Sequence, residues 1–256
     1  MEFCPSDLQK KFQILITRPL SDEQLQLAES LGLDTHVQPA IVTESRKEWA
    51  GLEALLQHPD YPILAFTSRN AVIALKSCAG NSRELLKKKR VYAVGEKTAS
   101  ELQLLGCEPL LPDQSDGTGL AKKIANDLLT GSFTGKPGVL HLCGNRRRNE
   151  FRQFLEGSEI DVRDVVVYQT RLLKMQFNSV QKDAVLFYSP SAIESFRKSG
   201  GFEHPAHQSA ELFAIGHTTG EELSAETART VHISPEANSE QFLHFTAQIL
   251  SLQRFN

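Results

Sequence analysis

The stretch FTSRNAVIAL, residues 66–75, occurs a second time in the chain as FYSPSAIESF, residues 187–196. In both copies an apolar run ends near a serine, Ser68 or Ser189, and a helical pattern of apolar residues follows. The two serines lie 121 positions apart. A strand–turn–helix unit that occurs twice predicts an α/β fold with two related halves.

A second pair of motifs keeps this spacing. AVGEKTASEL, residues 93–102, matches AIGHTTGEEL, residues 214–223, and their glycines Gly95 and Gly216 again lie 121 positions apart. Any chain in which strands and helices alternate contains some partial sequence matches of this kind. The shared offset favours duplication of a unit of about 120 residues, and two units are too few for a solenoid. We therefore expect two similar α/β domains.

A weaker match relates residues 14–44 to residues 139–170 at an offset of 125. It aligns Gly32 with Gly157, Val37 with Val162 and Val42 with Val167.

Short apolar segments alternate with helical patterns along the whole chain, which predicts parallel sheets. One further short strand is predicted in CEPLLPD, residues 107–113. Ligands of such sheets bind outside the carboxyl ends of the strands. Six strand-to-helix turns are predicted there: TRPLS (17–21), TSRNA (67–71), VGEKT (94–98), CGNRRR (143–148), YSPSA (188–192) and IGHTT (215–219).

Composition excludes several classes of protein. The 256 residues fit two domains, and a net charge of −3 argues against a nucleic-acid binder. No apolar run approaches the ~18 residues of a membrane span, and the start shows no secretory signal, so we expect a cytoplasmic protein. No CxxC pair, GxGxxG or phosphate-loop motif occurs, so no metal or nucleotide cofactor is expected. Reduced thiols are expected at Cys4, Cys78, Cys107 and Cys143.

The turns indicate anion binding, because the first N–H groups of each helix lack an intrahelical partner. Hydroxyl groups beside them could add hydrogen bonds to a ligand; each could equally be an ordinary helix cap. Their duplication in both halves favours a polyanionic ligand. The candidates are Thr67, Ser68, Thr98, Ser189, Ser191, Thr218 and Thr219.

The charged residues at the turns point the same way. The run from Arg146 to Arg148 opens a helix, where cations oppose the dipole, so an anion is expected nearby. Arg18 and Arg69 also lie in turns and could bind a carboxylate or form surface ion pairs. Gly95 and Gly216 could allow close approach of a ligand or adopt a positive φ.

Acid–base machinery is not evident in the sequence. The eight histidines form no ligand pattern, and no Ser-His-Asp arrangement or carboxylate pair stands out. Tyr168, in VVVYQT, could pack in a strand or offer its phenol to a ligand.

Taken together, seven motifs resemble the uroporphyrinogen-III synthase family in order and spacing, over about residues 14–250. They are ITRP (16–19), FTSRNAV (66–72), VGEKTA (94–99), LCGNRRR (142–148), VYQT (167–170), FYSPSAIESF (187–196) and AIGHTT (214–219).

The resemblance implies two flavodoxin-like parallel-sheet domains joined by a two-stranded linker, with a cleft between them. Domain 1 would comprise residues 1–36 and 172–256, and domain 2 residues 44–164. The linker strands would be residues 37–43 and 165–171.

The resemblance also implies a lyase of heme and porphyrin biosynthesis. The family cyclises hydroxymethylbilane, a linear tetrapyrrole polycarboxylate, inverting ring D and losing water without a cofactor. Tyr168 would assist loss of the hydroxyl group. Substrate would meet Thr67, Ser68, Arg69, Thr98, Ser189, Thr218 and Thr219, and the charge argument adds Arg18 and Arg146. We expect a monomer that contacts no nucleic acid or membrane, with transient contact to hydroxymethylbilane synthase.

Two alternatives remain. A two-domain small-anion-binding protein without catalysis would share the paired domains, although the periplasmic kind carries a secretory signal. A nucleotide enzyme on a Rossmann-like sheet would need a glycine-rich first turn, and TRPLSDEQ (17–24) has no glycine.

Overall fold

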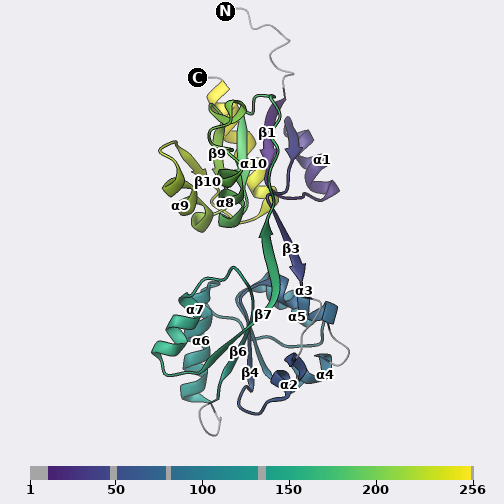
Figure 1. Ribbon diagram of the computed structural model, residues 1–256, viewed down its shortest axis with the longest axis vertical. Helices are drawn as coiled ribbons and strands as arrows, with labels where there is room; N and C mark the ends of the chain where they lie inside the picture. The colour runs from purple at the N-terminus through teal and green to yellow at the C-terminus, as the bar shows by residue number, and fades with distance from the viewer. Residues whose placement is uncertain (1–10, 47–50, 79–81, 132–136, 255–256) are drawn as a thin grey trace, which may run out of the picture. The chain divides into compact units, whose positions relative to one another are not determined.

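The computed structural model describes residues 11–46, 51–78, 82–131 and 137–254 (Figure 1). The chain divides into two compact units. Unit 1 comprises Met1–Val42 and Arg171–Asn256, and unit 2 comprises Thr43–Thr170. Unit 1 is therefore built from both ends of the chain and unit 2 from its middle.

Unit 1 contains a five-stranded sheet of order β10-β9-β8-β1-β2, and its neighbouring strands run parallel. Read across the sheet from its β2 edge, the strands are the second, first, third, fourth and fifth of unit 1 in chain order. The elements of unit 1 are β1 (Phe12–Ile16), α1 (Asp22–Ser30), β2 (Leu33–Val37), β8 (Ala184–Phe187), α8 (Pro190–Lys198), the 3-10 helix η2 (Pro205–His207), β9 (Glu211–Ala214), α9 (His217–Glu226), β10 (Val231–Ile233) and α10 (Ser239–Arg254).

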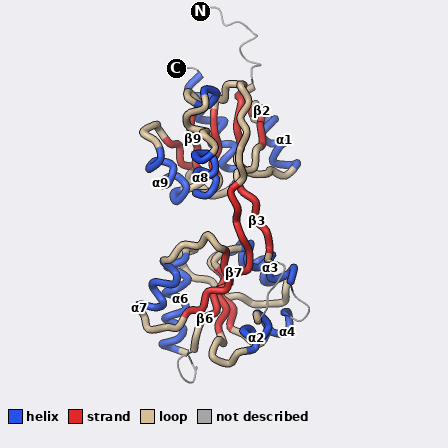
Figure 2. The backbone as a smooth tube through the Cα atoms, in the orientation of Figure 1, coloured by secondary structure: helices blue, strands red, loops and turns tan. Residues whose placement is uncertain are grey.

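Unit 2 is organised around a sheet of order β3-β7-β6-β4-β5, in which β7, β6, β4 and β5 run parallel (Figure 2). Its elements are β3 (Ile41–Ser45), α2 (Leu52–Gln57), β4 (Ile63–Phe66), α3 (Arg69–Cys78), α4 (Ser82–Lys87), β5 (Arg90–Ala93), α5 (Glu96–Gln103), α6 (Gly117–Thr130), β6 (Val139–Gly144), α7 (Glu150–Gly157) and β7 (Val162–Leu172).

The chain passes between the units along β3 and β7. The N–H of Arg46 donates to the carbonyl of Val167 at 3.1 Å, and that of Leu173 donates to Ala40 at 2.9 Å, so the two strands run antiparallel. Pro39 lies between β2 and β3, outside either ladder, as its missing N–H predicts.

Both sheets are covered by helices on both faces. In unit 2, Leu64 and Phe66 pack with α3 and α5, whereas Ile63 and Ala65 pack with α6 and α7. In unit 1 the corresponding layers are α8 with α9 and α1 with α10. Strands buried on both faces read as continuous apolar runs, which is why the sequence reveals them. Among the described residues, no helix is both long and apolar enough to span a bilayer.

The expected strand in residues 107–113 is wrong. Leu110 alone bridges β5, through a bond from its N–H to Val91 at 2.9 Å and one from Ala93 to its carbonyl at 3.0 Å. Pro109 and Pro112 flank it and cannot donate to a ladder, so pairing stops after one residue.

The offset of 125 also needs correction. Ile14 pairs with Thr35 in unit 1 and Val139 with Val162 in unit 2, so the second strands of the two sheets match at an offset of 127. Gly32, with φ 76°, then corresponds to Glu159, with φ 58°. β1 ends at Ile16, the equivalent of His141, whereas β6 continues to Gly144, and the turns that follow are equally long (17–21 and 145–149). The additional residues therefore lie at the end of β6.

Candidate functional site

Tyr168 and Ser68 come together at the carboxyl edge of the unit 2 sheet. Tyr168 is 8% exposed and lies opposite Gly144 in the β6–β7 register. A Cβ at position 144 would lie 2.5 Å from the tyrosine ring, so the close approach requires glycine. Burial raises the pKa of Tyr168, while a hydrogen bond from the Ser68 hydroxyl acts in the opposite direction. The phenol is therefore protonated at neutral pH.

Asn145, which sequence reasoning did not single out, secures the strand around Tyr168. Its N–H donates to the Tyr168 carbonyl at 3.2 Å. Its side-chain amide accepts from the N–H of Thr170 at 2.8 Å and donates to the Thr170 carbonyl at 3.3 Å. The turn after β6 is thus hydrogen-bonded to the backbone of Tyr168 and, two residues further, of Thr170.

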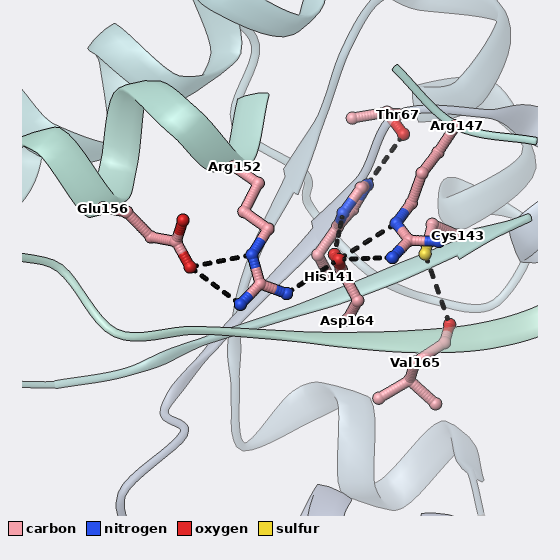
Figure 3. A network of polar contacts seen from close by, with 8 residues as sticks. All are labelled: Thr67, His141, Cys143, Arg147, Arg152, Glu156, Asp164 and Val165. Atoms are coloured by element: carbon pink, nitrogen blue, oxygen red, sulfur yellow. Dashed lines mark hydrogen bonds and ion pairs between the residues drawn. The ribbon is translucent and has the colours of Figure 1, made fainter. Parts of the chain in front are cut away.

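Figure 3 shows a buried polar network around His141. His141 contacts Phe151 on the face of the sheet covered by α6 and α7, whereas Tyr168 packs on the face covered by α3 and α5. His141 Nε2 lies 2.8 Å from the Thr67 hydroxyl, and His141 Nδ1 lies 2.8 Å from Asp164 Oδ1. The side chains of His141 and Asp164 are 2% and 6% exposed, whereas Thr67 is half-buried. The contacts therefore run from the interior to the edge of the sheet at Thr67.

Two arginines complete the network. Arg147 Nε and Nη2 each lie 2.9 Å from Asp164 Oδ2, and Arg152 Nη1 lies 3.1 Å from the same oxygen. Arg152 also donates to Glu156 at 2.7 Å. Burial alone would raise the pKa of Asp164, but hydrogen bonds from His141 and Arg152 and the charges nearby hold it well below its usual range.

The network changes the interpretation of the arginine turn. The anion beside Arg147 is an internal carboxylate, Asp164, so this arginine gives no evidence for a bound ligand. Arg146 and Arg148 are exposed at the surface of the turn.

Neither His141 nor Asp164 is predicted from the sequence. His141 stands in the otherwise apolar strand VLHLCG, whereas Asp164 follows the charged Arg163 in VRDVVV, and the β6–β7 register places the two opposite each other. A polar residue inside a buried strand was an available signal for His141 alone.

The other predicted residues of unit 2 lie at helix starts. Arg69 is exposed at the first position of α3. Thr98 is 4% exposed in the first turn of α5. Gly95, which precedes α5, has φ −178°, and Gly216 before α9 has φ −177°. Both glycines are extended, so the positive-φ interpretation is wrong, and the two motifs adopt the same conformation in both units.

In unit 1, Ser189 caps α8 by accepting a hydrogen bond from the N–H of Ala192 at 3.3 Å. Thr218 is half-buried and Thr219 is 5% exposed in the first turn of α9. Two copies of one arrangement thus place serine and threonine at equivalent helix starts.

Arg18 lies over the ring of Tyr188, with 4.6 Å from Cζ to the centroid. It donates to Pro19 O at 3.2 Å and to Gln24 Oε1 at 3.5 Å. The Tyr188 hydroxyl is buried and has no hydrogen-bond partner among the described residues, and burial raises its pKa to about 12.

His141, Cys143 and Asp164 offer ligand atoms within 4.8 Å of one another, the spacing of a possible metal site. Burial raises the pKa of Cys143 to about 12, and its thiol donates to Val165 O at 3.7 Å. Cysteine binds a metal ion as its thiolate. The carboxylate of Asp164 is already paired with two guanidinium groups. This donor set favours an internal ion-pair network over a bound cation.

Two related α/β units, each with hydroxyl-bearing turns at its sheet edge, define a duplicated α/β protein suited to an anionic ligand. The family model described as Uroporphyrinogen-III synthase HemD matches residues 22–244. The chain belongs to this family, whose members are cyclising lyases. The resemblance inferred from the motifs is confirmed.

Solved structures show the same fold. Uroporphyrinogen-III synthetase from Helicobacter pylori 26695 matches with a TM-score of 0.66 and 19% identity, over 93% of this chain and 99% of that one. A mutant uroporphyrinogen III synthase from the extremely thermophilic bacterium Thermus thermophilus matches with a TM-score of 0.66 and 16% identity, over 95% and 99%. Comparison with curated proteins found no significant match.

Proposed function

We propose that this chain cyclises hydroxymethylbilane to uroporphyrinogen III, inverting ring D with loss of water, in tetrapyrrole biosynthesis. The observation that carries the proposal is the family match over residues 22–244. The arrangement around Tyr168 supports it, because this part of the site offers a protonated phenol.

Tyr168 is the proposed catalytic residue. In the cyclisation, the bond between the terminal methylene carbon and its hydroxyl oxygen breaks, and the oxygen leaves as water. That departure needs a proton or a strong hydrogen bond at the oxygen. A phenol whose oxygen accepts from Ser68 keeps its own proton available for the substrate hydroxyl.

Binding is proposed at the helix starts of both units. N–H groups that have no intrahelical partner and the helix dipole attract the substrate carboxylates there. Holding the bilane in a folded-back geometry directs attack to the substituted carbon of ring D. The proposed binding residues are Arg18, Thr67, Ser68, Arg69, Thr98, Arg146, Ser189, Thr218 and Thr219.

We further propose that the units are flavodoxin-like domains linked by residues 37–43 and 165–171, and that the protein acts as a cytoplasmic monomer. The strand order of unit 1 supports the first point, and the free thiols of Cys107 and Cys143 fit a reducing compartment. Transient contact with hydroxymethylbilane synthase is proposed for delivery of an unstable substrate.

One assay tests the function. Hydroxymethylbilane is generated in situ from porphobilinogen by its deaminase, and the products are oxidised and separated as uroporphyrins. We expect isomer III in excess over the enzyme-free blank. A product of isomer I alone would reject catalysis and favour an anion-binding protein.

A further inference from the structure

The contacts from Asp164 through His141 to Thr67 fix the direction of a hydrogen bond. Asp164 is an acceptor with lowered pKa, so the hydrogen on His141 lies on Nδ1, which donates to Oδ1 at 2.8 Å. In a neutral imidazole Nε2 is then a bare acceptor. The Thr67 hydroxyl, 2.8 Å from Nε2, must donate its only hydrogen to it.

The formal charges around His141 are balanced without a charge on the imidazole. The carboxylates of Asp164 and Glu156 already match the guanidinium groups of Arg147 and Arg152. A positive charge on a side chain only 2% exposed would add a buried cation beside the partly exposed guanidinium groups of Arg147 and Arg152. His141 also packs against Phe151, with ring centroids 4.6 Å apart, an apolar contact that offers no compensating charge.

The fold does not require this network. The β-sheet registers match His141 to Ile16 and Asp164 to Val37 in unit 1. The offset of 121 matches Thr67 to Tyr188. The equivalent positions in unit 1 therefore hold two apolar residues and a tyrosine, and a buried polar network costs desolvation that the sister unit avoids. Its presence in unit 2 indicates a role beyond folding.

We infer that Thr67 presents only acceptor lone pairs to the ligand and binds a pyrrole N–H of the bilane, not a carboxylate. The inference rests on the proposed function. A linear tetrapyrrole carries both carboxylate acceptors and pyrrole N–H donors, and a hydroxyl whose hydrogen is taken by His141 can serve only the donors. His141 and Asp164 are positioning residues that set the direction of the hydrogen bond made by the Thr67 hydroxyl. The carboxylates are left to the backbone N–H groups at the helix starts.

The direction of the hydrogen bond between Thr67 and His141 can be measured without any assay of activity. In ¹⁵N spectra of the full chain at neutral pH, His141 is expected to show a protonated Nδ1 and an unprotonated Nε2. His141→Gln identifies the signal. A protonated Nε2 would leave the Thr67 hydrogen free to donate and would overturn the inference.

The ligand group is tested with two competitive inhibitors in the bilane assay. Uroporphyrinogen III carries carboxylates and pyrrole N–H groups, whereas benzenehexacarboxylate carries carboxylates only. Thr67→Val is expected to weaken inhibition by uroporphyrinogen about tenfold, the loss of one hydrogen bond near 1.4 kcal/mol, and to leave inhibition by benzenehexacarboxylate within about twofold. Thr67→Ser is expected to recover most of the loss.

Thr246→Val is the matched control, since it removes a buried hydroxyl that donates to Phe242 O within α10. An equal loss for both inhibitors in Thr67→Val would assign Thr67 to a carboxylate, and an unchanged uroporphyrinogen affinity would remove Thr67 from the site. Either result overturns the inference while wild-type protein still makes isomer III. Failure of the proposed function is distinct, because wild-type protein would then make isomer I alone.

Discussion

The ring of Tyr168 lies so close to Gly144 that a Cβ on the glycine would sit 2.5 Å from the ring carbons and 2.8 Å from the hydroxyl oxygen. The contact joins the end of β6 to β7 at the point where the β6–β7 register shifts. The absence of a side chain at Gly144 therefore allows the phenol to lie where the proposed chemistry needs it.

Gly144→Ala is expected to displace the tyrosine ring. Overpacking of this kind costs about 1–3 kcal/mol of unfolding free energy, and the displaced phenol should lower kcat more than it changes KM. Denaturant unfolding and steady-state rates measure the two effects. Gly157→Ala is the control: no atom of the described part of the chain lies within 4 Å of its added Cβ, so stability should be equal or slightly higher. A Gly144→Ala variant with wild-type kcat would contradict the proposed position of Tyr168.

Tyr168→Phe is expected to lower kcat by about 10²–10⁴, the usual contribution of a positioned proton donor. Tyr92→Phe provides the matched control, because it also removes a buried phenol hydroxyl, here bonded to Asp127 at 2.9 Å. Both variants should lose similar stability, and only Tyr168→Phe should lose rate. Equal rates in the two variants would remove Tyr168 from catalysis.

The fold could be predicted from the sequence because parallel strands are buried on both faces. Leu64 and Phe66 pack to one side of β4 while Ile63 and Ala65 pack to the other, so the strand reads as an unbroken apolar run. The repeated serine and glycine turns then mark the starts of α3, α5, α8 and α9.

The network could not be predicted because it depends on strand register. An offset of 125 pairs Asp164 with Pro39, whereas the observed offset of 127 pairs it with Val37 and places it opposite His141. The change of two residues in the offset between the first and second strands thus conceals the contact between the histidine and the aspartate. Tyr168 was predicted from the family resemblance, whereas its contact with Gly144 follows only from the structure.

Asp164→Asn is expected to destabilise unit 2 at neutral pH by about 2–4 kcal/mol, because Arg147 and Arg152 lose a buried partner. The folded-state pKa of Asp164 is lowered, so its stabilisation is complete above the pKa of the unfolded chain, about 4, and falls as the pH drops below it. The difference in unfolding free energy between wild type and variant should therefore shrink from about pH 5 downward. A difference that stays constant to low pH would show that the carboxylate charge contributes nothing.

Ser68→Ala and Ser189→Ala form a matched pair across the repeat. Ser68 accepts from the N–H of Asn70 at 3.2 Å and Ser189 from that of Ala192 at 3.3 Å, so each variant should lose about 1 kcal/mol of capping. Ser68 contacts Tyr168, where its hydrogen bond lowers the pKa that burial raises. Ser68→Ala should therefore move the alkaline limb of the kcat–pH profile to higher pH, with a mild loss of rate, and Ser189→Ala should leave that limb in place. Identical profiles for the two variants would mean that Ser68 does not tune the phenol and acts only as a helix cap.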